Sequence, residues 1–183
     1  GLRYDEVRPG NLVKVNLQGR VIDGSGAPVN PSGFAIHGAV HAARPDAVCV
    51  MHLHTRWGQT LAALPSVDGG LLPCSQPALR LWRRLGRHAY EGLAFEADER
   101  ARLVAALGSR DGLILANHGT LTVGRTVAEA FVLMHLLERA AQIQIAAMAA
   151  GRVDCVSDEI AERTQRQWLG DGSVPEGQDE WPA

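Results

Sequence analysis

Two apolar runs that each lead into a histidine motif constrain the fold of this chain most strongly. One run, residues 46–51, continues into His52-Leu-His54, and the other, residues 111–116, ends in Asn117-His118-Gly119. Short apolar runs rich in β-branched residues and closed by polar residues or glycine are typical of buried β-strands. Because side chains alternate between the two faces of a strand, His52 and His54 are expected to project from the same face.

The histidines His52, His54 and His118 are the candidate ligands of a metal ion. Neutral imidazole nitrogens bind zinc at about 2.0–2.1 Å, and three of them with one open position are typical of a catalytic site. The same ligands suit Fe(II) or Mn, so we expect one divalent ion per subunit, with zinc first and Fe(II) or Mn next. Strand alternation places Cys49 on the opposite face from His52, which excludes it as a ligand. By itself, a histidine pair on a strand also occurs without any metal.

The remaining pattern predicts a mixed α/β fold in a single domain over residues 1–183. We expect a hairpin of residues 11–16 and 20–23, helices over 32–43, 57–63, 76–88, 98–107, 127–150 and 157–169, and strands over 46–51 and 111–116. Loop-like residues from 170 to 183 are expected to form a mobile tail.

The longest expected helix, residues 127–150, begins with the capping-box spacing of Thr126-Val-Ala-Glu129. Its apolar residues cover more than one face, which indicates that the helix is buried on opposite sides. In a chain of this size, we expect one side to pack on the sheet and the other on a second subunit.

Charge and composition limit the expected partners. The 183 residues, 46% hydrophobic, suffice for one well-buried core. A net charge of −2, with arginines interleaved with acidic residues, gives no basic surface for nucleic acid or an anionic membrane. No run approaches the roughly 20 apolar residues of a membrane helix. Three widely spaced cysteines favour a reducing compartment, so we expect a cytoplasmic protein whose partners are small molecules or further copies of itself.

A series of motifs makes the chain resemble the class II aldolase/adducin family. In order, they are Ala-Arg44-Pro45-Asp46, His52-Leu-His54-Thr, Leu-Ala-Asn117-His118-Gly119-Thr-Leu-Thr-Val-Gly124 and Val127-Ala-Glu-Ala130-Phe131. The likeness covers about residues 1–150. Two further motifs, Gly33-Phe34-Ala-Ile-His37 and Gly70-Leu-Leu-Pro, are most similar to the adducin-like branch.

The resemblance implies a three-layer α/β/α sandwich around a mostly antiparallel central sheet. It also implies a homotetramer with active sites near subunit contacts, and a divalent metal held by His52, His54 and His118. The upstream helix and loop of the family, which contribute further phosphate contacts, are expected before Gly1.

One departure from the family pattern limits the activity that the resemblance implies. The sugar-phosphate aldolases of the family carry a Ser-Ser-Glu motif, in which the serines help to bind phosphate and the glutamate is the acid/base beside the metal. This chain has Pro31-Ser32-Gly33 at the matching positions, so Ser32 is retained as a candidate substrate-binding residue while the carboxylate is absent. Because a positioned acid/base contributes about 10²–10⁴-fold, an ordinary phosphosugar aldolase is disfavoured.

Two further residues receive candidate roles. His37 lies one helical turn beyond Gly33, and we expect it to face the cavity and either transfer a proton or bind a substrate carboxylate. The alternative is a polar histidine on a helix face. Asn117 is expected either to orient His118 as an outer-shell group or simply to form the turn before Gly119.

These observations favour a metal-dependent carbon–carbon lyase or decarboxylase acting on a small oxo- or hydroxy-carboxylic acid. Such chemistry needs an electron sink more than a strong base, which is consistent with the lost glutamate. The fold is also similar to that of Fe(II)-dependent non-haem oxygenases that shorten aromatic oxo-acids, which gives a second hypothesis. A third is a non-catalytic adducin-like interaction module, which has no chemical need for all three histidines.

Overall fold

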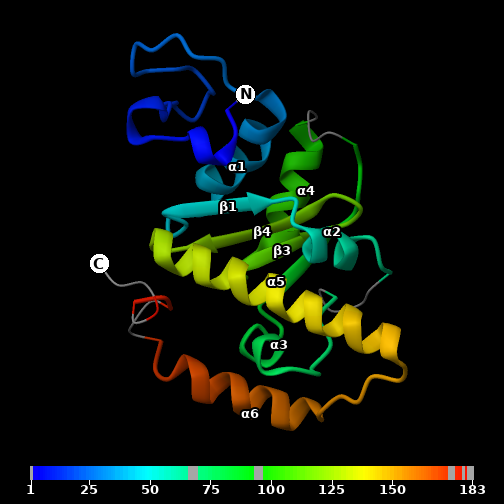
Figure 1. Ribbon diagram of the computed structural model, residues 1–183. Coiled ribbons are helices and arrows are strands. Elements are labelled where there is room, and N and C mark those ends of the chain that lie inside the picture. Colours follow the sequence, from blue (N-terminus) through cyan, green and yellow to red (C-terminus); the bar gives the residue numbers. More distant parts are fainter. Residues whose placement is uncertain (1, 66–69, 93–96, 173–175, 179, 181–183) are drawn as a thin grey trace.

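The computed structural model describes residues 2–65, 70–92, 97–172, 176–178 and 180, and a four-stranded sheet lies at its centre (Figure 1). The strands are β1 (Cys49–Leu53), β2 (Leu85–His88), β3 (Gly112–Leu115) and β4 (Gly119–Gly124). Their order in the sheet is β1-β4-β3-β2. β4 is antiparallel to both β1 and β3, and only the pair of β2 with β3 is parallel, so the sheet is mostly antiparallel.

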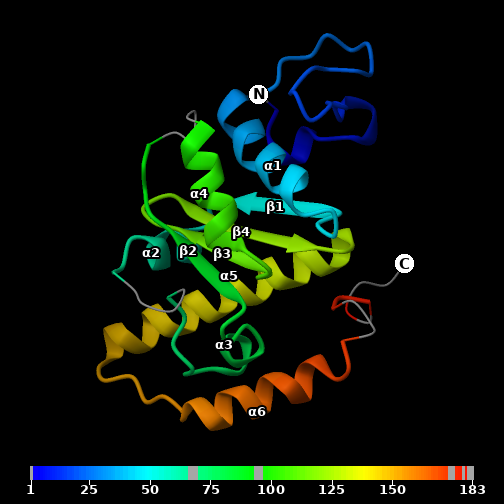
Figure 2. The ribbon, with the colours of Figure 1, turned by 180° about the vertical axis from the view of Figure 1, so that it is seen from behind.

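Helices cover both faces of this sheet. They are α1 (Pro31–Ala43), α2 (Arg56–Ala62), α3 (Gln76–Arg80), α4 (Ala97–Leu107), α5 (Val127–Ala150) and α6 (Asp158–Leu169), preceded by 3-10 turns at Tyr4–Glu6 and Pro9–Asn11. α1 and α4 lie on one face, whereas α2 and α5 lie on the other, with α3 and then α6 further out (Figures 1 and 2). The predicted three-layer α/β/α architecture is confirmed. No helix in the described part of the chain is both long and apolar enough to span a bilayer.

A hydrophobic core forms on each face of the sheet, because the strand side chains alternate between the two faces. Leu113 and Leu121 belong to the core that the sheet shares with α1 and α4, where Val40 is fully buried. Ile114 points the other way, into the core formed with α2, α3 and α5, where Leu137 is fully buried.

Polar caps fix the starts of α1 and α5, as the sequence predicts. The Asn30 side chain accepts hydrogen bonds from the Ser32 backbone N–H at 3.1 Å and from the Ser32 hydroxyl at 3.1 Å. At the start of α5, the Thr126 hydroxyl accepts from the Glu129 N–H at 3.0 Å. The Glu129 carboxylate then accepts from the N–H of Arg125 rather than that of Thr126, so half of the predicted capping box forms.

The predicted helix over residues 76–88 is wrong beyond Arg80. The chain leaves the helix, Arg83 adopts a left-handed backbone with φ of 56°, and residues 85–88 become β2. Pairing with β3 decides this conformation, together with a close approach to α4 at Gly86. A Cβ atom on Gly86 would lie 2.3 Å from the carbonyl oxygen of Ala106, so this contact requires glycine.

Two strand predictions also need correction. The hairpin predicted for residues 11–23 forms a single antiparallel bridge between Val15 and Val21, without extended strands. Conversely, no strand was expected at 119–124, although Thr120-Leu-Thr-Val123 alternates in the manner of a strand and forms β4. All residues of β4 are buried because it is an inner strand with helices on both faces.

The apolar circumference of α5 has an explanation within one chain. One side of α5 packs on β4 and β1, and α2 and α3 cover another side. Leu133, Leu137 and Ala141 are therefore buried among elements of the same chain. The predicted burial on opposite sides does not require a second subunit.

Part of the predicted tail, residues 170–183, lies outside the described residues. Within the described part, Glu176 forms ion pairs of 2.6 Å with both Arg80 and Arg84. Burial raises the pKa of Glu176, but the hydrogen bonds and charges of Arg84 and Arg80 outweigh burial and lower it below its ordinary value. These pairs attach Glu176 to α3 and the turn that follows it. The mobility of the tail stays a prediction.

Candidate metal centre

The candidate centre lies at the end of β1, on the face of the sheet that α1 and α4 cover. His52 is in β1, and His54 immediately follows the strand. His118 lies in the turn between β3 and β4. The antiparallel pairing of β1 with β4, which sets Leu53 opposite Thr120, brings this turn beside the end of β1.

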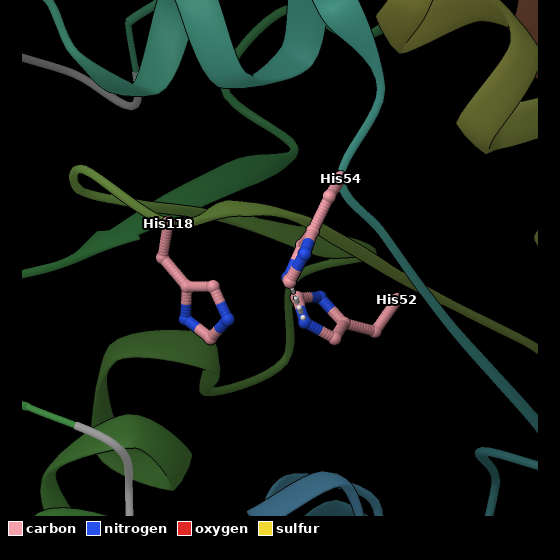
Figure 3. Close-up of side chains that lie close together, drawn as sticks. All are labelled: His52, His54 and His118. Carbon is pink, nitrogen blue, oxygen red and sulfur yellow. Dashed lines mark hydrogen bonds between the residues drawn. The ribbon is translucent and has the colours of Figure 1, made fainter. Parts of the chain in front are cut away.

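The structure brings together the three histidines that the sequence singles out, and their rings converge (Figure 3). The ring centroids are 4.8 Å apart in each of the three pairs. One ring nitrogen from each histidine lies within 4.8 Å of the others. A cavity of about 410 Å³ borders residues 52–55, so a small molecule can approach the cluster from the side of His52 and His54.

One ring nitrogen of His52 bonds to the backbone, and the other faces the ring of His54. Nδ1 of His52 lies 3.0 Å from the carbonyl oxygen of Thr120, which places the ring proton on Nδ1 and leaves the Nε2 lone pair directed at the cluster. Burial, followed by the charges of the neighbouring histidines, lowers the pKa of His52 to about 4 despite the bond to Thr120. Burial and then His54 also lower the pKa of His118. Neutral imidazole is the form that binds metals.

The nitrogens fit a divalent ion with a preference for nitrogen ligands. Two ligands about 2.0–2.1 Å from a tetrahedral ion lie roughly 3.3–3.4 Å apart. The Nε2 atoms of His52 and His54 are 3.1 Å apart, close to this spacing. Without an ion, two neutral imidazoles share a proton across the same distance. Three imidazole ligands would leave the full charge of a bound ion available to an anionic substrate.

α2 holds the backbone that carries His118. Asn117 adopts a left-handed backbone with φ of 54°, and its N–H donates to the carbonyl oxygen of Ala62 at 3.0 Å. The side chain of Gln59 donates to the carbonyl oxygen of His118 at 3.2 Å. Asn117 thus has the conformation of the turn-forming alternative, with an exposed side chain. Orientation of His118 by the Asn117 side chain stays a prediction.

α1 presents His37 to the cluster. The centroid of its ring lies 6.5 Å from that of His52, and His37 is half-buried. Burial and then the charge of His41 lower the pKa of His37. Gly33 has open space in front of it, because the nearest heavy atom to an added Cβ is a side-chain atom of Asn30 at 3.8 Å. The space that a side chain at position 33 would enter is therefore not filled by a close neighbour at its Cβ.

Glu138 of α5 is a polar residue near the centre that sequence reasoning missed. Its carboxylate accepts from the Thr55 hydroxyl at 2.5 Å, from the Gly58 N–H at 2.8 Å and from the Trp57 N–H at 3.2 Å. In the sequence, Glu138 is noticeable only as an acidic residue within the apolar helix predicted at 127–150. The pattern does not indicate which segment that residue contacts, because the contact joins segments about 80 residues apart.

Comparison with known proteins identifies the family of this chain. The family described as Class II Aldolase and Adducin N-terminal domain matches residues 1–145. The chain belongs to this family. A Caulobacter vibrioides protein provisionally named as a class 2 aldolase is 44% identical over 183 residues, which is 100% of this chain and 70% of that protein. Alpha-adducin of Rattus norvegicus is 42% identical over 153 residues, which is 82% of this chain and 20% of adducin.

Solved structures of the class II aldolase family have the same fold. A crystal structure of an aldolase II superfamily protein from Pseudomonas syringae has a TM-score of 0.91 and 41% identity, and the match covers 99% of this chain and 72% of that one. L-fuculose 1-phosphate aldolase from Glaciozyma antarctica has a TM-score of 0.73 and 31% identity, with coverage of 85% and 59%. The chain thus spans part of the length of each relative.

Proposed function

We propose that this chain binds one divalent metal ion through His52, His54 and His118 and belongs to a metal-dependent carbon–carbon lyase or decarboxylase. The convergence of three imidazoles, with Nε2 of His52 directed at the cluster because Nδ1 bonds to Thr120, is the observation that carries the proposal. Membership of the class II aldolase family and the fold shared with L-fuculose 1-phosphate aldolase support a lyase. We propose zinc as the metal, with Fe(II) or Mn next.

The proposed substrate is a small oxo- or hydroxy-carboxylic acid. A metal held by neutral ligands would polarise adjacent substrate oxygens and stabilise the negative charge left when a carbon–carbon bond breaks. The acid/base carboxylate of the sugar-phosphate aldolases is replaced by Gly33, which has space around it. This replacement favours a reaction that depends on charge stabilisation rather than on a strong base.

We assign His37 and Ser32 to the substrate. His37 lies next to His52, and its lowered pKa favours a neutral ring at pH 7, which can take up a proton or donate its N–H to a substrate carboxylate. Ser32 lies at the start of α1, where its hydroxyl donates to Asn30 and retains lone pairs that accept a hydrogen bond. We further propose a homotetramer, as the family resemblance implies.

Elemental analysis of anaerobically purified protein tests the metal. We expect one ion per chain in the wild type and strong loss in His118→Ala. The matched control is His135→Ala, because His135 is exposed on α5. The loaded protein is then incubated without oxygen with a panel of 2-oxo and hydroxy acids, and release of CO₂ or an aldehyde is measured. Iron content with consumption of O₂ would favour the oxygenase hypothesis instead, which gains no support from the relatives described above.

A non-catalytic interaction module is the second candidate, because alpha-adducin is 42% identical over 82% of this chain. In that case the fold is a scaffold, and the histidines have no chemical task. Wild-type protein that contains no metal and gains none on titration would favour this module and contradict the lyase.

A further inference from the structure

The carboxylate of Glu138 closes the start of α2 from a different helix. Thr55 is the N-cap residue of α2, but its side chain makes no cap hydrogen bond within that helix. The first turn instead donates three hydrogen bonds to Glu138, from the Thr55 hydroxyl and from the backbone N–H groups of Trp57 and Gly58. Free N–H groups at a helix start favour a negative charge, so Glu138 both satisfies these donors and stabilises the helix end.

α2 in turn contacts the backbone of two of the three histidines. Its N-cap, Thr55, directly follows His54 in the chain, so fixing Thr55 fixes the point from which the His54 side chain departs. Further along α2, Gln59 donates to the carbonyl oxygen of His118, and the carbonyl oxygen of Ala62 accepts from the N–H of Asn117. The position of α2 therefore sets the spacing between His54 and His118.

Tight packing restricts the movement of α2, whose first turn is hydrogen-bonded to Glu138. A Cβ atom on Gly58 would lie 2.6 Å from the Thr55 hydroxyl oxygen and 3.1 Å from side-chain atoms of Thr120. Thr120 also supplies the carbonyl oxygen that binds Nδ1 of His52. The contact between Gly58 and Thr120 thus links the clamped end of α2 to the residue that orients the third histidine.

We propose that Glu138 is a positioning residue of the metal centre, which sets the spacing of its ligands by clamping the start of α2. This inference rests on the proposed function, because it presupposes that the three histidines bind a metal. It adds a long-range requirement: the affinity for metal depends on a carboxylate of α5 that does not belong to the ligand set.

Gln144 provides a matched control on the same helix. It is buried, and its side chain accepts from the Leu72 N–H at 2.7 Å and donates to the Gly70 carbonyl oxygen at 2.9 Å. It therefore clamps a loop to α5, as Glu138 clamps α2, but that loop carries none of the three candidate histidines. Loss of either side chain is expected to lower stability, and loss of Glu138 alone is expected to change the metal site.

The experiment measures the Kd for zinc by competition with a chromophoric chelator, together with the visible spectrum of the Co(II)-loaded protein. Glu138→Ala is expected to raise Kd by up to about 10- to 100-fold, the range for loss of a group that hydrogen-bonds a metal ligand directly, and to alter the Co(II) spectrum. Gln144→Ala is expected to lower the Tm while leaving Kd and spectrum as in the wild type. Glu138→Gln, which keeps one acceptor oxygen, is expected to fall between Glu138→Ala and the wild type.

The outcomes separate this inference from the proposed function. Wild-type protein without metal affinity overturns both. Wild-type affinity in Glu138→Ala, measured below the Tm of that variant, overturns the role of Glu138 alone, as does an equal loss in Gln144→Ala. If Glu138→Ala does not fold, Glu138→Gln and Thr55→Val decide, because each weakens the clamp with a small change of shape. Unchanged Kd in both of these variants contradicts the inference.

Discussion

At the scale of single residues, the protonation of His52 links the candidate centre to stability. Its pKa is about 4 in the folded protein without metal, because burial opposes the charged form, whereas an unfolded histidine titrates near 6.5. Between these two values the unfolded chain binds a proton that the native state does not. This group therefore makes the free energy of unfolding fall as the pH falls from about 6.5 to about 4.

The pH dependence is measured by urea unfolding of the metal-free protein. We expect the wild type to lose more stability between pH 7.5 and pH 5 than His52→Gln, which has no titrating ring at this position. Equal losses in the two proteins would show that His52 is protonated in the native state at pH 5, against the pKa that its burial gives.

His37 gives the sharpest prediction about turnover. If it transfers the proton, His37→Ala is expected to bind metal like the wild type while kcat falls by about 10²–10⁴-fold. His41→Ala is the control, because His41 lies one turn further along α1, is exposed and bonds to the carbonyl oxygen of Ala47. Both variants are assayed with the acid identified in the substrate panel. Unchanged turnover in His37→Ala refutes the proton-transfer role.

At the scale of elements, contact between β2 and α4 depends on Gly86. Replacement by alanine forces a Cβ against the carbonyl oxygen of Ala106, so Gly86→Ala is expected to cost about 1–3 kcal/mol or more of unfolding free energy. Gly33→Ala is the control, since its Cβ has room in α1 and alanine favours a helix by roughly 0.5–1 kcal/mol. In denaturant unfolding, the unfolding free energy is expected to be lower than the wild-type value for Gly86→Ala and higher for Gly33→Ala. An unchanged unfolding free energy in Gly86→Ala would mean that α4 moves to make room for the added Cβ without cost.

Local periodicity explains which elements the sequence predicts. The helices α1, α2, α4, α5 and α6 follow from apolar spacing and caps, because these are properties of neighbouring residues. β2 was missed because residues 76–88 keep a helical spacing, and pairing with β3 overrides it. Strand alternation predicts that His52 and His54 share a face, and His118 is singled out because it also follows an apolar run. The clamp by Glu138 depends on contact between segments distant in sequence, which spacing does not reveal.

At the scale of the whole molecule, the chain after α6 returns to α3 through Glu176. The side chain of Glu176 is 10% exposed and that of Glu180 is 44% exposed, although both pair with Arg80. Glu176→Ala is therefore expected to lower the unfolding free energy by about 1–3 kcal/mol, because buried donors lose their acceptor. Glu180→Ala is expected to cost less than about 1 kcal/mol, as for an exposed pair.

Urea unfolding of the two variants checks this difference, and metal titration provides a second measurement. Zinc affinity is expected to stay at the wild-type value in both, because the ion pairs lie on the α3 side of the sheet and the histidines on the α1 side. A large loss of affinity in Glu176→Ala would instead show that the end of the chain communicates with the centre.

The pairing of β1 with β4 joins residues almost 70 positions apart, since His52 bonds to Thr120 across it. Closing such a long loop costs conformational entropy before His118 can meet His52 and His54. An ion that requires all three nitrogens therefore has no equivalent site in the unfolded chain. The binding free energy of the proposed ion would add to that of folding, so the native fraction of this protein would rise with the concentration of available metal.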